Sequence, residues 1–268
     1  MKARLHPVVG LVGILTLALL YLPLLAVAMF SVNASRYGLT WRGFTLDWYV
    51  RLMHNQAIQQ ATWNTLVLAV LSTLISTILG TLLAIAMERF PWPNRIRKAF
   101  DLVVYIPVVM PDIVFAAALV VAFGVLRSAW SVFEPGLLTM IVAHVTFQIA
   151  FVALVVQSRL ATLGRVLEEA ARDLYASTWY YLRRVLLPLL APGIVAGAML
   201  AFTLSLDDFV ISFFTAGPES TTLPIHIYAS VRRGVTPEIH ALSTLIFLAT
   251  VVLVIGLERM TRVVKRKA

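Results

Sequence analysis

The sequence predicts an all-α integral membrane protein with six transmembrane helices. Hydrophobic residues make up 60% of the 268 residues and charged residues only 13%, whereas soluble domains contain about 25% charged residues. Six apolar runs are each long enough to cross a bilayer, which takes roughly 20 helical residues. Most of the 22 lysines and arginines then fall on one side of the resulting topology. Composition, run length and charge placement therefore agree on a multi-pass membrane protein in a lipid bilayer.

The six runs occupy most of the chain, at about residues 8–30, 63–87, 102–125, 137–156, 189–211 and 241–257. Only short connections remain between them, so the sequence predicts a single transmembrane domain over residues 1–268, with a core region at about 60–258 and no separate catalytic domain. The first run is longer than the roughly 7–15 apolar residues of a secretory signal. We therefore expect it to be retained as an anchor.

Six crossings place both termini on the same side of the membrane. That side receives Lys2 and Arg4 and the basic residues of segments 89–98, 159–184 and 259–267. Because positively charged residues are enriched in cytoplasmic loops, both termini and the 159–188 loop are predicted to be cytoplasmic. The net charge of +9 is thereby explained by topology, and we expect no nucleic-acid partner.

The segments around the second and third runs have distinct features. After the first run, residues 31–62 are polar and aromatic and favour an extracytoplasmic loop with an interfacial helix at about 46–53. In the second run, Ser72, Ser76 and Gly80 recur at helical spacing, which favours close helix packing. Pro107 and Pro111 predict a kink or break in the third run.

Two polar residues in the fourth run, His144 and Gln148, are four positions apart and therefore share one helix face. A buried histidine more often makes an interhelical hydrogen bond than binds a ligand, but a place on a substrate pathway stays open. Beyond the fifth run, residues 213–240 are polar and rich in Gly and Pro and are predicted to form a second extracytoplasmic loop.

Three carboxylates, Asp112, Asp207 and Asp208, lie within or at the edge of apolar runs. A central Asp costs about 2.5–3.5 kcal/mol to insert, so such residues normally face a protein interior or a water-filled path. No Lys or Arg lies inside these runs to neutralise them, which favours a cationic cargo or a basic partner from another subunit. Alternatively, Asp207 and Asp208 cap a helix break by accepting backbone N–H bonds.

The longest polar segment lies between the fourth and fifth runs. Residues 167–174 are rich in Glu, Ala, Leu and Arg, which favour a helix, and Ser177 is placed to cap a second helix that runs toward Pro188. A helical knuckle that projects from a membrane domain is suited to bind a soluble partner.

This segment resembles the Glu-Ala-Ala loop of ABC importer permeases. Glu169, Ala170 and Ala171 match the start of that pattern, Leu187 and Pro188 match its end, and Tyr175 stands at the position of its glycine. The resemblance implies the type I ABC importer permease architecture, with residues 159–188, including Asp173, as the loop that couples to an ATPase. A tyrosine forced to positive φ costs roughly 1 kcal/mol or more, so either the turn differs or packing holds Tyr175.

A narrower resemblance covers nearly the whole chain. Residues 111–114, 202–208 and 234–242 are similar to the second permease subunit of spermidine/putrescine importers. That family implies a bacterial inner-membrane location, a second homologous permease subunit, two copies of a cytoplasmic ABC ATPase and a periplasmic polyamine-binding protein. Import is then driven by ATP, and the candidate pathway comprises Asp112, Asp207, Asp208, His144 and Gln148.

Other functions fit less well. The chain has no Gly-x-x-x-x-Gly-Lys-Ser/Thr phosphate loop, no catalytic triad motif and no cysteine. We therefore expect no enzyme activity, no metal site and no cofactor in this chain, with ATP and Mg²⁺ bound by the ATPase. The alternatives are an ABC permease for another small solute, such as an anion or a metal ion, and an ion-coupled secondary transporter.

Overall fold

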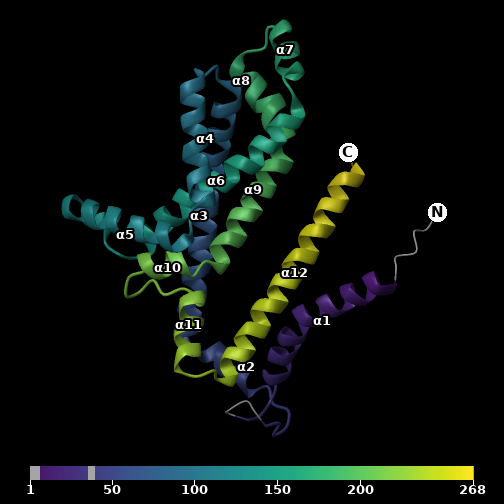
Figure 1. Cartoon of the computed structure of the whole chain (residues 1–268), viewed down its shortest axis with the longest axis vertical. Helices are drawn as coiled ribbons and strands as arrows, with labels where there is room; N and C mark the ends of the chain where they lie inside the picture. Colours follow the sequence, from purple (N-terminus) through teal and green to yellow (C-terminus); the bar gives the residue numbers. More distant parts are fainter. Residues whose placement is uncertain (1–6, 36–39, 268) are drawn as a thin grey trace. The chain divides into compact units, whose positions relative to one another are not determined.

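The computed structural model describes residues 7–35 and 40–267, and these are almost entirely helical (Figure 1). They pack as two compact units, one formed by residues up to Gln59 together with those from His226 onward, and one formed by Gln60–Ile225. Lys2 and Arg4, which support the predicted orientation, lie outside the described residues. The elements in order are α1 (Pro7–Phe30), α2 (Asp47–His54), α3 (Gln56–Arg89), α4 (Asn94–Val109), α5 (Asp112–Ala129), η1 (Ser131–Phe133), α6 (Leu137–Leu163), α7 (Val166–Asp173), α8 (Thr178–Tyr181), η2 (Leu182–Leu186), α9 (Leu187–Asp207), α10 (Val210–Thr215), α11 (Leu223–Arg233) and α12 (Pro237–Lys267).

The predicted spans correspond to long apolar helices. Among the described residues, five helical segments are long and apolar enough to cross a membrane, namely Val8–Phe30, Gln56–Arg89, Asp112–Ala129, Leu137–Leu163 and Thr178–Asp207. A sixth, shorter apolar stretch covers Pro237–Val252 at the start of α12. The all-α membrane fold with six apolar helical segments is therefore confirmed. A helix is found as α2 where the sequence predicted one at about 46–53.

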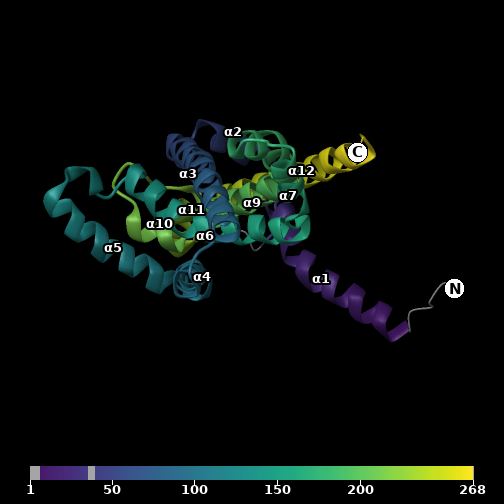
Figure 2. The same cartoon turned by 90° about the horizontal axis from the view of Figure 1, so that it is seen from above.

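Helices α3, α6 and α9 form the centre of the Gln60–Ile225 unit (Figure 2). A Cβ atom added at Gly80 of α3 would lie 2.7 Å from the Cβ atom of Val152 in α6, and one at Gly197 of α9 would lie 3.3 Å from the same side chain. Helix α6 is therefore in close contact with both neighbours. Gly80, one of the small residues predicted to allow close packing in the second span, does so against α6.

Two of the predicted spans are interrupted. The third run breaks between α4 and α5 at Met110–Pro111, because a proline lacks the N–H that would continue the helix and disfavours helical geometry in the residue before it. Pro107 remains inside α4. The fifth run ends its helix at Asp207 and restarts at Val210. The predicted loop at 213–240 is also only partly irregular, since it contains the end of α10 and all of α11.

In the other unit, α1 and α2 both pack against α12. The connection from α1 to α2 is held by the side chain of Trp48, whose Nε1–H donates to the Asn33 carbonyl at 2.8 Å, and by a 2.7 Å hydrogen bond between the hydroxyls of Ser31 and Tyr49. These two hydrogen bonds therefore stabilise the connection between α1 and α2.

Candidate functional site

Helix α7 carries the Glu-Ala-Ala sequence and ends in a reversed turn at Tyr175. The N–H of Ala176 donates to the Ala171 carbonyl at 3.0 Å, and the N–H of Tyr175 donates to the Arg172 carbonyl at 2.9 Å. This pair of bonds is the Schellman motif, in which the residue after the helix takes a left-handed conformation and is usually glycine. Tyr175 has φ of 55°. The chain therefore forms the left-handed turn that glycine usually provides, although it has a tyrosine at this position.

Side-chain packing within this chain does not stabilise the positive φ of Tyr175, because this residue is 97% exposed. Glu169, Ala170 and Asp173 are also exposed, whereas Ala171 is half-buried against the central hydrophobic cluster. The acidic side chains of Glu168 and Glu169 occupy the first turn of α7, where they interact favourably with the helix dipole. The exposed face of α7 thus combines a carboxylate with large apolar side chains at its end.

The segment after the turn leads back into the membrane helix. The Ser177 hydroxyl accepts the N–H of Tyr180 at 3.3 Å and caps α8 as predicted. Residues 182–186 then form a π-helical turn before α9. Pro188 supplies the reason, since it has no N–H to donate to the carbonyl four residues earlier and its ring crowds that carbonyl. Leu187 and Pro188 are both exposed.

A mostly apolar groove of about 760 Å³ lies against this turn. It is lined by Leu167, Ala170, Ala171, Leu174, Tyr175, Ala176, Ser177, Tyr180 and Val185. Ala170, Ala171 and Tyr175, which belong to the predicted ATPase-coupling loop, therefore lie on one concave surface. Such a surface is suited to contact a protein partner.

A second polar group of residues is buried between α6, α9 and α10. His144 has no exposed surface; its Nδ1 lies 2.8 Å from the Ser205 Oγ atom and its Nε2 lies 3.0 Å from the Ser212 Oγ atom. The same Nε2 is 3.3 Å from a carboxylate oxygen of Asp208. His144 and Asp208, which are 64 positions apart in the sequence numbering, are therefore direct neighbours.

Asp208 also closes the break between α9 and α10. Its two carboxylate oxygens accept the backbone N–H groups of Ile211 at 3.2 Å and Ser212 at 2.7 Å. These are two of the donors that the first turn of a helix leaves without intrahelical partners. The structure thus shows for Asp208 the capping geometry that the sequence left as an alternative. Its side chain is 8% exposed.

Gln148 lies one turn along α6 from His144. Its side-chain oxygen accepts the Ser76 hydroxyl at 3.1 Å, and its Nε2 donates to the Ala201 carbonyl at 3.1 Å. Ser72 in turn lies 3.3 Å from Ser205. The serines at 72, 76, 205 and 212 were not among the predicted site residues. The signal that could have found them is the recurrence of hydroxyl groups in apolar helices, where they bond across interfaces.

Asp112 and Asp207 are placed differently from Asp208. Asp112 is the first residue of α5 and Asp207 the last of α9, and both are exposed. Neither makes an ion pair with any residue that the structure describes. Of the five predicted pathway residues, His144, Gln148 and Asp208 therefore lie in the buried polar group. The carboxylates of Asp112 and Asp207 are exposed.

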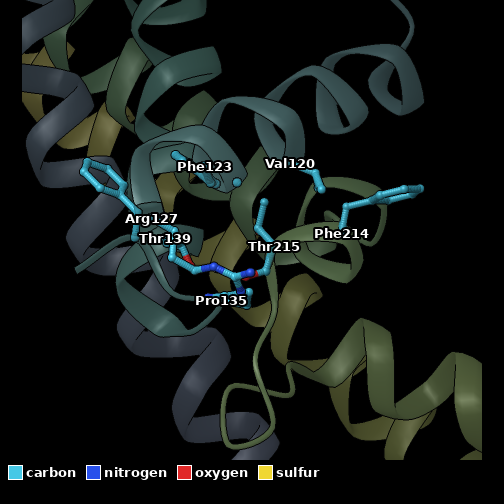
Figure 3. A pocket seen from close by; sticks show the side chains of 9 residues that line it. Val120, Phe123, Arg127, Pro135, Thr139, Phe214 and Thr215 are labelled. Carbon is cyan, nitrogen blue, oxygen red and sulfur yellow. The ribbon is translucent and has the colours of Figure 1, made fainter. Parts of the chain in front are cut away.

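A small pocket of about 160 Å³ lies between α5, α6 and α10 (Figure 3). The Arg127 side chain extends through it toward Thr139, Thr215 and Pro135, and Phe123 and Val120 lie on the α5 side. None of the predicted pathway residues is among the residues that line this pocket. It is therefore separate from the buried polar group.

Residues 76–268 match the family described as "Binding-protein-dependent transport system inner membrane component". The chain is 38% identical over 245 residues to the spermidine/putrescine transport system permease protein PotC of Escherichia coli K12, covering 91% of this chain and 90% of that protein. It is 42% identical over 231 residues to the putrescine transport system permease protein PotI of the same organism, covering 85% and 81%.

Among solved structures, the fold matches a bacterial ABC transporter involved in the import of the acidic polysaccharide alginate. The TM-score is 0.74 with 22% sequence identity, and the match covers 95% of this chain and 94% of that one. At this identity the likeness concerns the fold alone. The fold is that of an ABC importer permease.

Proposed function

Because the chain belongs to the family of binding-protein-dependent transport system inner membrane components, we propose that it is a permease subunit of an ATP-driven importer of polyamines in the bacterial inner membrane. The observation that carries this proposal is the identity of 38% and 42% to two polyamine permeases over most of the chain. The exposed carboxylates at helix ends agree with a cargo that carries ammonium groups.

A second homologous permease, two copies of a cytoplasmic ATPase and a periplasmic polyamine-binding protein complete the importer. This chain has no phosphate-binding loop, so ATP and Mg²⁺ are bound by the ATPase. Both termini and the α7–α8 loop then face the cytoplasm, as the distribution of basic residues favours.

The surface around α7 is where we place the ATPase. Glu169 supplies a charge for the partner, and the apolar groove beside Leu174 and Tyr175 supplies contact area. An interface of this kind combines a desolvated apolar centre with charges that set orientation. Closure of the ATPase dimer would then displace α7 together with the helices attached to it.

For the cargo path we assign separate roles to the two groups of carboxylates. Asp112 and Asp207 are exposed and unpaired within the described residues, so they contact the ammonium groups directly. Asp208, His144 and Gln148 are held by internal bonds and support the helix break that positions Asp207. Weak, hydrated contacts suit a path, since a deep binding site would slow release.

The test is ATP hydrolysis by the complete complex in lipid bilayers, with the binding protein added together with putrescine, spermidine, an anionic solute or a divalent metal ion. Stimulation by a polyamine alone is the expected result. Stimulation by an anion or a metal instead would keep the importer but reject the polyamine assignment. Uptake without any ATPase partner would favour the ion-coupled secondary transporter.

A further inference from the structure

An arginine at the end of α3 is enclosed by the connection between α6 and α7. Arg89 is the last residue of α3, and its Nη2 donates to the Gly164 carbonyl at 2.8 Å. Its Nη1 lies 3.9 Å from a carboxylate oxygen of Glu168. The two side chains are only 11% and 16% exposed. A single guanidinium group therefore contacts the chain on both sides of the first residue of α7.

This enclosure is unusual for an arginine at a helix end. Arg and Lys side chains normally keep their charged heads in water, and burial of a charge is unfavourable unless it is paired. The Nε atom of Arg89 is buried and has no hydrogen-bond partner among the described residues. The pairing with Glu168 and the Gly164 carbonyl thus has to hold this charge in place.

Two further interactions extend this contact, one within α7 and one between the residue before α7 and the end of α3. The other carboxylate oxygen of Glu168 accepts the Arg172 Nη2 at 2.7 Å, one helical turn further along α7. In the opposite direction, the Arg165 Nη2 donates to the Glu88 carbonyl at 3.3 Å. The end of α3 and the beginning of α7 are therefore joined by bonds that run both ways.

The same α3 helix reaches the buried polar group in the membrane region. Two of its hydroxyl residues, Ser76 and Ser72, contact Gln148 and Ser205 respectively. A continuous rigid element therefore connects the loop at α7 to the residues around the break between α9 and α10.

We infer that Arg89 is a positioning residue that makes α3 and α7 move as one body, so that displacement of α7 by the ATPase is transmitted along α3 to the cargo path. This inference rests on the proposed function as an ATP-driven importer. It concerns Glu168 and Arg89, which lie beside the Glu-Ala-Ala sequence and outside it.

The absence of cysteine from the chain permits a direct test. Arg89→Cys and Glu168→Cys are introduced together, and the complete complex is assayed for polyamine uptake per ATP hydrolysed before and after treatment with a short bis-maleimide cross-linker. Before cross-linking we expect uptake per ATP to fall about fivefold, within the range for positions along a coupling route. Cross-linking is expected to restore it, because the two helices are again joined.

Three controls make the result specific. Each single cysteine variant, treated with the same reagent, is expected to remain impaired. Arg95→Ala removes an exposed arginine of α4 that has no hydrogen bond or ion pair in the part of the chain that the structure describes, and is expected to leave coupling unchanged. Arg89→Lys keeps the charge but not the two-pronged geometry, so its uptake per ATP is expected to be intermediate.

Several outcomes would overturn the inference. Normal coupling in the untreated double variant would show that the pair is not needed. Failure of cross-linking to restore uptake, with the ATPase still bound, would show that α3 and α7 must move relative to each other. Loss of the ATPase from the purified complex would assign the pair to docking. If the unmodified complex shows no polyamine-stimulated hydrolysis, the proposed function fails as well, and both are rejected together.

Discussion

The α7 loop and the buried polar group around His144 both place polar residues beside apolar helices, but they use them in opposite ways. Around His144, each polar side chain has partners inside the chain, and Asp208 alone accepts two backbone N–H groups. Around Tyr175, the side chains of Leu174, Tyr175 and Glu169 extend into solvent. The polar groups around His144 are hydrogen-bonded within the chain. The exposed side chains around Tyr175 remain available to contact a partner protein.

The same contrast between a buried and an exposed polar group is found for two neighbouring aspartates. Asp207 and Asp208 are adjacent and chemically identical, yet one is exposed and the other is enclosed by His144 and Ser212. Neighbouring residues on a helix point about 100° apart, and here the helix ends between them. Stability and transport should therefore respond differently to substitution at the two positions.

The largest effect is expected for Asp208→Ala. The substitution leaves the N–H groups of Ile211 and Ser212 without the carboxylate that accepts them and removes the carboxylate beside the His144 ring, so we expect a loss of about 3 kcal/mol in stability. Thermal unfolding of the purified subunit in detergent measures it. The matched variant Asp207→Ala should unfold close to the wild-type temperature while reducing uptake. Equal stability of the two variants would contradict the division of roles.

Within the membrane core, Gly80→Ala tests the close contact of α3 and α6. A Cβ atom there would lie 2.7 Å from Val152 and 2.9 Å from the Ile149 carbonyl oxygen, so we expect a destabilisation of about 2 kcal/mol through overpacking. Gly124→Ala in α5 is the control, since a Cβ atom there meets nothing within 4 Å. The two thermal unfolding curves are compared directly, and a wild-type curve for Gly80→Ala would show that the helices separate easily.

On the loop, Glu169→Lys should act on transport and leave the fold intact. The side chain is exposed, so its charge reversal is expected to lower polyamine uptake at least about tenfold, equivalent to roughly 1.4 kcal/mol of lost interaction with the ATPase. Membrane insertion, measured by protease accessibility, should be unchanged. Wild-type uptake by this variant would remove Glu169 from the coupling surface.

The smallest effect is expected for Tyr175→Gly. Glycine takes positive φ without steric cost, so the turn should gain up to about 1 kcal/mol, offset in part by the greater freedom of glycine in the unfolded chain. Hydrogen exchange at the N–H of Ala176, which closes the turn, measures the change. Faster exchange in the glycine variant would mean that the tyrosine side chain stabilises the turn itself.

Much of this molecule could be predicted from the sequence because its determinants are local or compositional. Apolar runs of about 20 residues, the prolines at 107 and 111 and the capping serine at 177 act through hydropathy and backbone geometry within a few residues. The spacing of Glu169, Tyr175 and Pro188 indicated the loop, and the structure shows its turn at Tyr175.

Other features depended on contacts between distant segments. The neighbourhood of His144 with Asp208, the enclosure of Arg89 by Gly164 and Glu168, and the close packing of Gly80 on Val152 each join different helices. Hydropathy and periodicity indicate which face of a helix is apolar. They do not indicate which other helix packs on that face or which residues of the two helices come into contact. The sequence by itself therefore determined the membrane class, the helical segments and the polar loop, while the tertiary structure decided which carboxylate is held inside and which is left free, because only packing determines where each polar group finds its partner.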